Sequence, residues 1–302
     1  MDKISVSNLQ IQMRKIADSE LILNSDKSIY HLKLQPHHIA KDIIVVGDPN
    51  RVKLISSKFD KIDYVVENRE FITHTGTFNN KPLTVIGTGI GTDNIDIVIN
   101  ELDALVNIDL NQKIVKNELN SLNIVRIGTC GALQKHINVD EFVLSEYALG
   151  LDGLMNFYEM QYNNDETKIL SAFYEQTNYS KQLTPPYVVK GSDKLHQLFA
   201  SECHSGITAT ASGFYGPQGR ELRLKLKEPM LNDKLHHFHL NDLKINNFEM
   251  ETSAIYGLAR LLGHNAITVC VAVANRYTKS FSKDYHPPMD KLIDLVLEKL
   301  TR

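Results

Sequence analysis

Four short runs of apolar, largely β-branched residues constrain the fold of this chain more than any other feature of its sequence. The runs span 43–47, 83–87, 124–128 and 267–274; three end in glycine and one in alanine. Short apolar runs of this kind are typical of strands that are buried on both faces of a sheet. The sequence therefore predicts a central sheet with at least four buried strands.

Helical patterns lie between these runs. Apolar residues recur at steps of three and four over 93–106, 250–262 and 290–300, so each segment has one apolar face. In the last segment the inward positions are Leu292, Ile293, Val296, Leu297 and Leu300. Strands that alternate with helices predict an α/β protein, an αβα sandwich with helices on both faces of the sheet. Sites in such sheets form where strand ends meet loops, so we expect the chemistry there.

The chain is predicted to form one main domain. Residues 1–28 are polar with scattered apolar positions and are predicted to be an N-terminal arm or a short helix. No linker rich in proline, glycine or serine follows, so residues 29–302 are predicted to be a single domain. The segment 150–180 lacks clear periodicity and is predicted to be rich in loops, and 226–247 is also irregular. Both segments are expected to cover a pocket.

Composition excludes several classes of protein. Apolar residues make up 42% and charged residues 23% of the 302 residues, which is ordinary for a globular protein. The net charge of −3 gives no field that recruits nucleic acid or an anionic membrane. No apolar run reaches the roughly 18 residues of a membrane span, and the first 20 residues are too polar for a signal peptide. The few, widely spaced cysteines fit a reducing compartment, so we expect a cytoplasmic protein: Cys130, Cys203 and Cys270.

The sequence GDPNR follows the first run, at 47–51. Gly47 lets a ligand approach the backbone, and Arg51 lies at the far side of the loop. Backbone amides and a guanidinium together form an anion site. The alternative is a turn with a surface arginine.

The sequence TGIGT follows the second run, at 88–92, and precedes a helical pattern. Thr92 stands where a dinucleotide-binding loop needs its third glycine, so that fingerprint fails. A loop that exposes backbone amides at the start of a helix still suits a phosphate or a ribose.

Arg126 lies inside an otherwise apolar run. An unpaired charge there would cost several kcal/mol, so Arg126 requires an anion. That anion is either a ligand or a carboxylate of the protein, for which Glu101 and Glu141 are candidates. Thr129, at the end of the run, can donate to the same anion.

The sequence FYGPQGR at 214–220 combines an aromatic pair with an amide and a guanidinium. The ring of Phe214 can stack on a flat base. Gln218 offers donors and an acceptor and Arg220 offers donors, which suits the carbonyl and imide edge of a pyrimidine. The alternative is a surface turn before a helix that begins near Glu221.

The sequence FEMET at 248–252 begins the second helical pattern. Glu251 can accept from ribose hydroxyls while Met250 packs on the sugar. The alternative is that acidic residues at this position only favour the helix dipole.

Other candidates are weak. His236, His237 and His239 lack companion ligands at metal spacing, so no metal site is predicted. No G-x-S-x-G nucleophile sequence occurs. Cys130 is interpreted as a small packed residue rather than a nucleophile.

Seven motifs, in this order, resemble the nucleoside phosphorylase family and in particular its uridine phosphorylase branch. The motifs are GDPNR, NREF (68–71), TGIGT, RIGTCG (126–131), FYGPQGR, FEMET and ANR (274–276). The resemblance runs from about His31 to the C-terminus. It implies a single α/β domain with a central mixed, partly barrel-like sheet. It also implies phosphorolysis, in which phosphate attacks the anomeric carbon of a nucleoside and the base leaves.

The resemblance also implies roles for individual residues. Phosphate would be held by Gly47, Arg51, Arg69, Arg126 and Thr129, ribose by His31, Met250 and Glu251, and the base by Phe214, Gln218, Arg220 and Arg276. Arg126, Gln218 and Arg220 would be the catalytic residues. Arg69 and His31 resemble residues that a neighbouring subunit lends, so we expect a homodimer, or a hexamer built of dimers, with shared active sites.

Uridine is the expected substrate, because purine relatives tend to have an aspartate where this chain has Asn275 and Arg276. The Pro217–Gln218 order, the glycines around it and Phe248 depart from the usual pattern. No cofactor is expected beyond phosphate as co-substrate, although Glu70 matches a position that holds a monovalent cation in some relatives. The alternatives are a purine or broad-specificity phosphorylase, a phosphate-independent nucleosidase, and a nucleoside-binding protein without activity.

Overall fold

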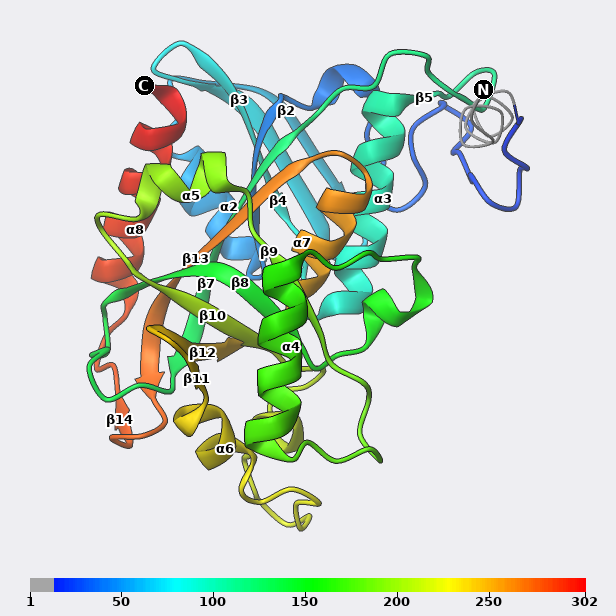
Figure 1. Cartoon of the computed structure of the whole chain (residues 1–302). Helices are drawn as coiled ribbons and strands as arrows, with labels where there is room; N and C mark the ends of the chain where they lie inside the picture. Colours follow the sequence, from blue (N-terminus) through cyan, green and yellow to red (C-terminus); the bar gives the residue numbers. More distant parts are fainter. Residues whose placement is uncertain (1–13) are drawn as a thin grey trace.

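The four predicted strands lie side by side at the centre of the computed structural model, which describes residues 14–302 (Figure 1). They are β1 (Asp42–Val46), β4 (Lys81–Gly87), β7 (Asn123–Ala132) and β13 (Asn265–Asn275). Their order in the sheet is β4-β1-β7-β13, and all three pairings are parallel. The parallel arrangement brings their carboxyl ends to one edge of the sheet, which confirms the predicted location of the glycine-bearing strand ends.

The other strands extend this core in both directions. Beyond β4 the sheet continues with two antiparallel strands, β3 and β2. These two strands span Lys61–Asn68 (β2) and Phe71–Phe78 (β3). The remaining strands of the sheet lie on the side of β13. They are β8 (Phe142–Gly150), β9 (Tyr187–Lys190), β10 (His204–Thr210), β11 (His239–Leu240), β12 (Leu243–Glu249) and β14 (Ser280–Phe281). A separate hairpin pairs β5 (Ile108–Asp109) with β6 (Ile114–Val115).

Part of the sheet closes on itself. β7 pairs with β13, β13 with β8, β8 with β10 and β10 with β12, and β12 returns to pair with β7. The register shift between Ala272 and Ala274 is an irregularity of the kind that bends a strand. The long strands β7 and β13 therefore belong both to the open sheet and to the closed ring. This confirms the mixed, partly barrel-like sheet.

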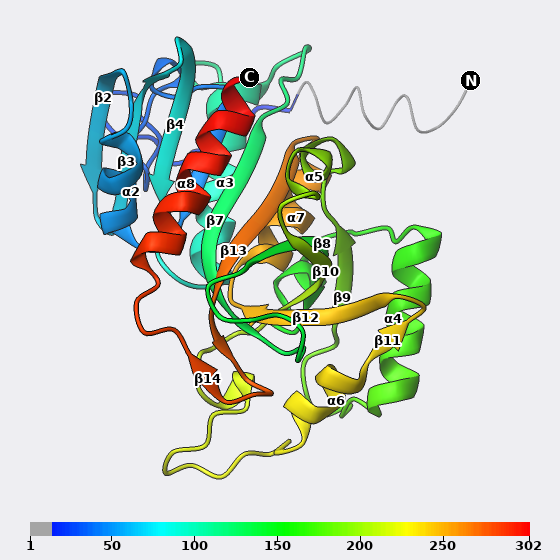
Figure 2. The ribbon, with the colours of Figure 1, turned by 90° about the vertical axis from the view of Figure 1, so that its left-hand side faces the viewer.

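Helices cover both faces, as the sandwich prediction requires (Figure 2). α3 and α7 pack on each other on one face, and α2 and α8 lie on the other. The three predicted helices are confirmed as α3 (Thr92–Asn107), α7 (Thr252–Leu261) and α8 (His286–Thr301). The others are α2 (Pro49–Ser56), α4 (Asn164–Thr177), α5 (Asp193–Phe199) and α6 (Leu231–His237), with single 3-10 turns at η1 (Pro36–His38), η2 (Leu154–Phe157) and η3 (Gly216–Gln218).

The prediction of a loop-rich segment at 150–180 is wrong, because α4 occupies much of it. Asn163 and Glu166 form a capping box that begins this helix. Only one side of α4 is buried, chiefly through Ile169 and Phe173, so its apolar period is faint in the sequence.

The segment 226–247 is also more regular than expected, since it contains α6, β11 and most of β12. No helix begins near Glu221, where the alternative for 214–220 placed one. The expectation that both irregular segments cover a pocket is confirmed. Leu151 and Tyr179 from one segment and Leu231 from the other line a cavity of about 640 Å³.

The described part of the N-terminal stretch, residues 14–28, forms turns and no helix. The amide of Ile16 donates to the carbonyl of Lys113 at 2.8 Å, and Leu21 is buried in the main core. The first 13 residues of the predicted arm lie outside the described residues. Within residues 14–302, no helix is both long and apolar enough to cross a membrane.

Candidate active site

Nine of the twelve predicted site residues line one cavity of about 440 Å³. The cavity lies where β1 and β7 end, beside the segment after β10 and the link between β12 and α7. The nine are Gly47, Arg51, Arg126, Thr129, Phe214, Gln218, Arg220, Met250 and Glu251. Segments that are far apart in the sequence therefore bring the predicted phosphate, ribose and base residues to one place.

Arg51 is a buried cation with no carboxylate partner among residues 14–302. Asp48 caps α2 by accepting from the amide of Asn50 at 2.9 Å, and this turn places the Arg51 side chain under the cavity. The guanidinium is 8% exposed, and its Nη1 donates to the carbonyl of Ile127 at 3.2 Å. Burial lowers the pKa of Arg51. A buried guanidinium that has only a neutral partner is suited to receive an anion from the cavity.

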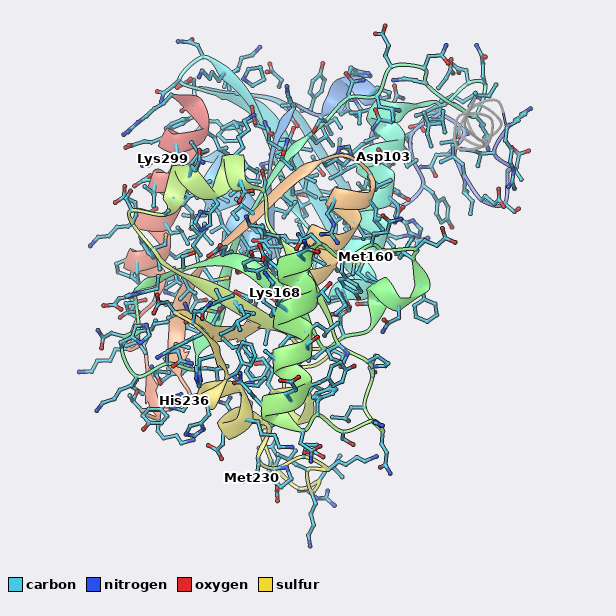
Figure 3. The ribbon with its side chains drawn as sticks, in the orientation of Figure 1. Asp103, Met160, Lys168, Met230, His236 and Lys299 are labelled. Atoms are coloured by element: carbon cyan, nitrogen blue, oxygen red, sulfur yellow. The ribbon has the colours of Figure 1, made fainter. Side chains whose placement is uncertain are left out.

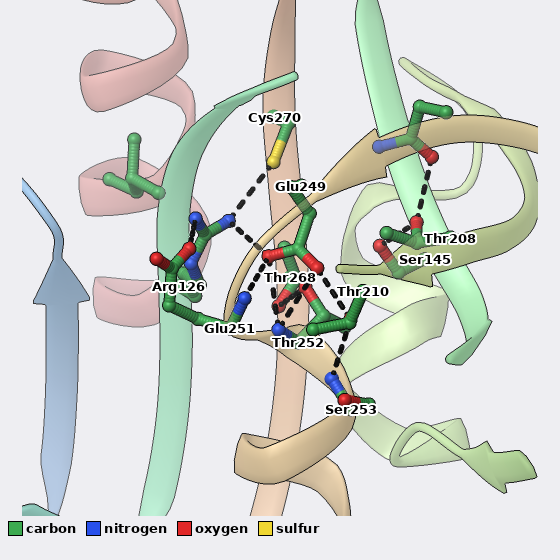
Figure 4. A network of polar contacts seen from close by, with 12 residues as sticks. Arg126, Ser145, Thr208, Thr210, Glu249, Glu251, Thr252, Ser253, Thr268 and Cys270 are labelled. Atoms are coloured by element: carbon green, nitrogen blue, oxygen red, sulfur yellow. Dashed lines mark hydrogen bonds and ion pairs between the residues drawn. The ribbon is translucent and has the colours of Figure 1, made fainter. Parts of the chain in front are cut away.

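Arg126 has its own carboxylates, as Figure 4 shows. Its guanidinium pairs with Glu251 and, at 3.3 Å from Nη1, with Glu249. Nη1 also donates to the sulfur of Cys270 at 3.2 Å. Burial alone would lower the pKa of Arg126, but the two carboxylates outweigh it and raise the pKa. The guanidinium is thus held charged and fixed in position at the cavity wall.

The two carboxylates suggested by the sequence are the wrong ones. Glu101 accepts from the backbone amides of His31 and Leu32 at about 3 Å, and Glu141 pairs with His204 at 2.8 Å. The true partners reach Arg126 because β12 pairs with β7 and closes the ring. That closure brings together residues more than 120 positions apart, which no local pattern reveals.

Glu249 is a functional candidate that the sequence reasoning did not single out. One of its oxygens accepts from the Thr210 hydroxyl at 2.6 Å, and the other accepts from the amides of Glu251 and Thr252 at 2.9 and 3.0 Å. Glu249 therefore caps the start of α7 and also faces Arg126. Its position two residues before Glu251 was the available signal.

The glycine-rich loop TGIGT contributes through its backbone. The amide of Gly91 donates to Oε1 of Glu251 at 2.8 Å, while Oε2 faces Arg126. Gly91 has φ of 101°, a conformation that favours glycine. Burial raises the pKa of Glu251, whereas Arg126 opposes that rise. The loop therefore positions the ribose candidate Glu251 through the amide of Gly91.

The base candidates hold one another in place. Nη1 of Arg220 donates to Oε1 of Gln218 at 2.7 Å and to the carbonyl of Phe214 at 2.6 Å. The guanidinium lies 3.7 Å from the centroid of the Phe214 ring. Among the described residues, none accepts from the amide nitrogen of Gln218, so this donor is left for a ligand. Burial, aided by the nearby Arg276, lowers the pKa of Arg220 to about 10.

Arg276 supports the base candidates from behind and does not line the cavity. Its Nη2 donates to the carbonyl of Gln218 at 3.3 Å. The preceding Asn275 is buried and fully used: its amide donates to Gln134 and Ile137, and its oxygen accepts from two backbone amides. Asn275 therefore fastens the end of β13 and has no group left for a base.

His31 and Arg69 do not line the cavity of their own chain. Nη2 of Arg69 donates to the Tyr30 hydroxyl at 3.1 Å, and Nδ1 of His31 pairs with Glu101 at 2.7 Å. Asn68 also donates to the carbonyl of His31 at 2.7 Å. The two residues therefore lie close together but apart from the other candidates, on a surface shared with the exposed Glu70 of the turn between β2 and β3.

No group of three histidine, cysteine or acidic side chains within residues 14–302 is arranged to hold a metal ion. Cys130 lies at the cavity wall, but it is buried, and burial raises the pKa of its thiol. This environment agrees with the interpretation of Cys130 as a packed residue.

Known proteins resemble this chain in sequence and in overall structure. The model of the phosphorylase superfamily matches residues 41–288. The chain is 29% identical to a uridine phosphorylase of Thermococcus kodakarensis over 90% of this chain and 86% of the relative. It is 27% identical to a purine nucleoside phosphorylase of Bacillus thuringiensis over 89% and 97%. The crystal structure of a Trypanosoma brucei nucleoside phosphorylase that shows uridine phosphorylase activity superposes with a TM-score of 0.85, at 30% identity and with 93% and 99% coverage.

Proposed function

Because the chain belongs to the phosphorylase superfamily, we propose that it cleaves uridine with inorganic phosphate to give uracil and ribose 1-phosphate. The observation that carries this proposal is the single cavity shared by the phosphate, ribose and base candidates. Relatives named uridine phosphorylase and the Trypanosoma brucei structure support the same activity. Uridine and phosphate are therefore the proposed substrates.

The phosphate half of the cavity would be formed by Arg51, Arg126 and Thr129. Arg126 is already balanced by two glutamates, whereas Arg51 has no acidic partner among the described residues. Arg51 therefore supplies the uncompensated positive charge that attracts phosphate. The Thr129 hydroxyl would donate to the same anion.

The ribose half would be formed by Glu251 and Met250. Glu251 is held by the Gly91 amide and by Arg126, so its position is fixed before a nucleoside binds. The transition state of glycosidic cleavage resembles an oxocarbenium ion. Phosphate positioned by the arginines would be both the nucleophile and a negative charge beside this cationic sugar.

The base half would stabilise the leaving group. Uracil departs with negative charge on its carbonyl oxygens, and the amide nitrogen of Gln218 and the guanidinium of Arg220 are the donors that meet it. These bonds strengthen as the charge develops, so they favour the transition state over bound uridine. Phe214 stacks with Arg220 and lines the same space.

A purine substrate is the weaker alternative, although purine phosphorylases are among the relatives. A purine leaving group gains from an acid that protonates a ring nitrogen. This chain has Asn275 and Arg276 where such an acid would be expected. Asn275 spends its whole side chain on backbone groups, and Arg276 is a cation whose Nη2 donates to the carbonyl of Gln218. The Gln218–Arg220 pair suits the pyrimidine instead.

We also propose that the active sites are shared between subunits, with phosphate bound partly by Arg69 and ribose by His31 of a neighbour. Both residues lie outside the cavity of their own chain and beside each other, which supports this. The proposed assembly is a dimer, or a hexamer built of dimers, and its interface would hold a monovalent cation near Glu70. The proposed location of the enzyme is the cytoplasm. Mixing Arg51→Ala and Arg69→Ala proteins at a phosphate concentration too low for either one to be active tests whether the active sites are shared. Mixed dimers would contain one intact site and regain activity at that concentration, whereas stable mixed dimers with no regained activity would contradict shared sites.

The activity itself is tested by base release from uridine, thymidine and inosine, each with and without phosphate. Strong release of uracil only with phosphate is the expected result. Phosphate-dependent release from inosine alone would replace the base assignment, and release without phosphate would mean a hydrolase.

A further inference from the structure

A second hollow lies at the end of the molecule away from the C-terminus (Figure 1). It has a volume of about 780 Å³ and is bordered by the segment after β7, the end of α6, the β11–β12 hairpin and the residues after β13. Figure 3 shows His236, a residue of α6, at this place. Among the described residues, none lines both this hollow and the substrate cavity, so the two are separate.

The hollow is rich in groups that attract anions. Lys135 and Lys244 line it from two different elements, and none of the described residues that line it carries a carboxylate. Within residues 14–302, neither ammonium group has an ion-pair or hydrogen-bond partner, and the same holds for the imidazole of His136. Burial, His204 and Lys244 lower the pKa of His136, and Glu141 opposes them only in part, so this imidazole is kept neutral. The positive charge of the hollow therefore comes from the two lysines, which have no ion-pair partner among the described residues.

The imidazoles of the hollow are oriented but do not form a metal site. Nδ1 of His236 donates to the carbonyl of Leu133 at 2.7 Å, and Nδ1 of His237 donates to that of Asp233 at 2.7 Å. These bonds leave Nε2 as the nitrogen that can meet a ligand. The described residues hold no group of three metal-ligating side chains, so the nitrogens do not converge on one ion.

Aromatic surface accompanies the charge. The rings of His236 and Tyr277 are stacked with centroids 4.2 Å apart. Tyr277 is 49% exposed, and its hydroxyl has no partner among the described residues. A hollow of this size can take a planar ring together with a phosphate group.

We propose that this hollow binds a phosphate group at a site separate from the substrate cavity. Lys135 and Lys244 contact the phosphate oxygens, because two ammonium groups from different elements match a dianion. The phosphate is either inorganic phosphate or the phosphate of a nucleoside monophosphate whose base meets Tyr277. This inference goes beyond the proposed activity and does not depend on it.

Calorimetric titration with two probes, inorganic phosphate and uridine 5′-monophosphate, tests the proposal. Four proteins are compared: wild type, the double variant Lys135→Ala/Lys244→Ala, Arg51→Ala, and Lys291→Ala. Arg51→Ala removes the anion residue of the substrate cavity, and Lys291 is an exposed lysine of α8 outside both hollows. The substituted lysines are exposed, so thermal unfolding should be unchanged and serves as the control for folding.

We expect the Arg51→Ala protein and the Lys291→Ala protein to keep the second binding event. The double lysine variant should lose it or bind at least about tenfold more weakly, with uridine phosphorolysis intact. If the monophosphate binds about tenfold more tightly than phosphate, a nucleotide is the ligand; equal affinities mean that phosphate suffices. A double variant that binds both probes as wild type does, or a wild type with one binding event only, would overturn the proposal.

Discussion

Replacing Arg126 and replacing Arg51 by alanine should have different consequences, although both arginines line the same cavity and are proposed to hold phosphate. Arg126 pairs with the buried carboxylates of Glu249 and Glu251. Arg51 is bonded only to a backbone carbonyl. Removing Arg126 therefore leaves two buried negative charges side by side, whereas removing Arg51 leaves none.

The magnitudes follow from these contacts. Removing one partner of a buried ion pair costs about 3–5 kcal/mol of unfolding free energy. In a large domain each kcal/mol lowers Tm by about 2–4 °C, so Arg126→Ala should lose about 6–20 °C. Arg51→Ala should change Tm little. It should raise the KM for phosphate by roughly 10- to 150-fold, from the loss of charge-assisted bonds of about 1.5–3 kcal/mol.

Thermal unfolding and phosphate saturation of uracil release measure the two effects. In the Arg126→Ala protein, Glu251 lacks its cation, so burial and the neighbouring charge of Glu249 raise the pKa of its carboxyl. When the pKa of a carboxyl is higher in the folded state than in the unfolded state, protonation of that carboxyl stabilises the folded protein. The deficit in Tm should therefore shrink as pH falls and grow as pH rises. Adding Glu249→Gln to Arg126→Ala should also recover part of the lost stability.

One result would refute this reasoning. If Arg126→Ala and Arg51→Ala unfold at the same temperature, and the deficit does not depend on pH, then the two carboxylates do not depend on Arg126. An unchanged KM for phosphate in Arg51→Ala would, in turn, remove Arg51 from the phosphate site.

Three further predictions concern the ribose and base halves of the cavity. Arg220→Gln removes the guanidinium that donates to Gln218 and lines the cavity beside the base candidates; kcat/KM for uridine should fall roughly 10- to 150-fold through the loss of a charge-assisted bond, and an unchanged kcat/KM would contradict this. Gly91→Ala strains a backbone at φ 101° and disturbs the amide that holds Glu251. We expect the free energy of unfolding to fall by at least about 1 kcal/mol and the KM for uridine to rise. The matched control is Gly263→Ala, at φ 79° with open space around it, which should lose stability without a change in KM. Thr210→Val removes the hydroxyl that donates to Glu249 at 2.6 Å, so it should lower the free energy of unfolding by about 1–3 kcal/mol and lower kcat. Wild-type values in chemical denaturation and turnover would show that Glu249 keeps its position without this hydroxyl.

The central fold was predictable because its signals are local. Each of the four predicted strands contains a short, largely apolar run. Each predicted helix has an apolar face, as in α8 with Leu292, Ile293, Val296 and Leu297 buried. α4 was missed because it lies at the surface and buries little apolar area. The start of α4 was nevertheless indicated in the sequence by the capping box of Asn163 and Glu166.

The residues of the site were predictable one by one, but their pairings were not. Arg126 could be identified as a charge in need of an anion from its apolar neighbours alone. The glutamates that pair with Arg126 are set by the closure of β12 against β7. That closure is a long-range property of the sheet. The same holds for the Gly91 amide, which serves Glu251 from a loop 160 residues away.

The closure of the ring also explains how charge is divided inside the cavity. Because β12 brings Glu249 and Glu251 to Arg126, the charge of that guanidinium is balanced and its pairing fixes the position of Glu251. Under the proposed function, the attraction for phosphate then falls to Arg51, and to Arg69 if a neighbouring subunit supplies it. A phosphate held by few uncompensated cations keeps more of its negative charge. That charge lies beside the sugar as the glycosidic bond breaks, where it stabilises the developing cation. A cavity in which Arg126 was also unpaired would bind phosphate more tightly in the ground state, and that added binding would not by itself raise turnover.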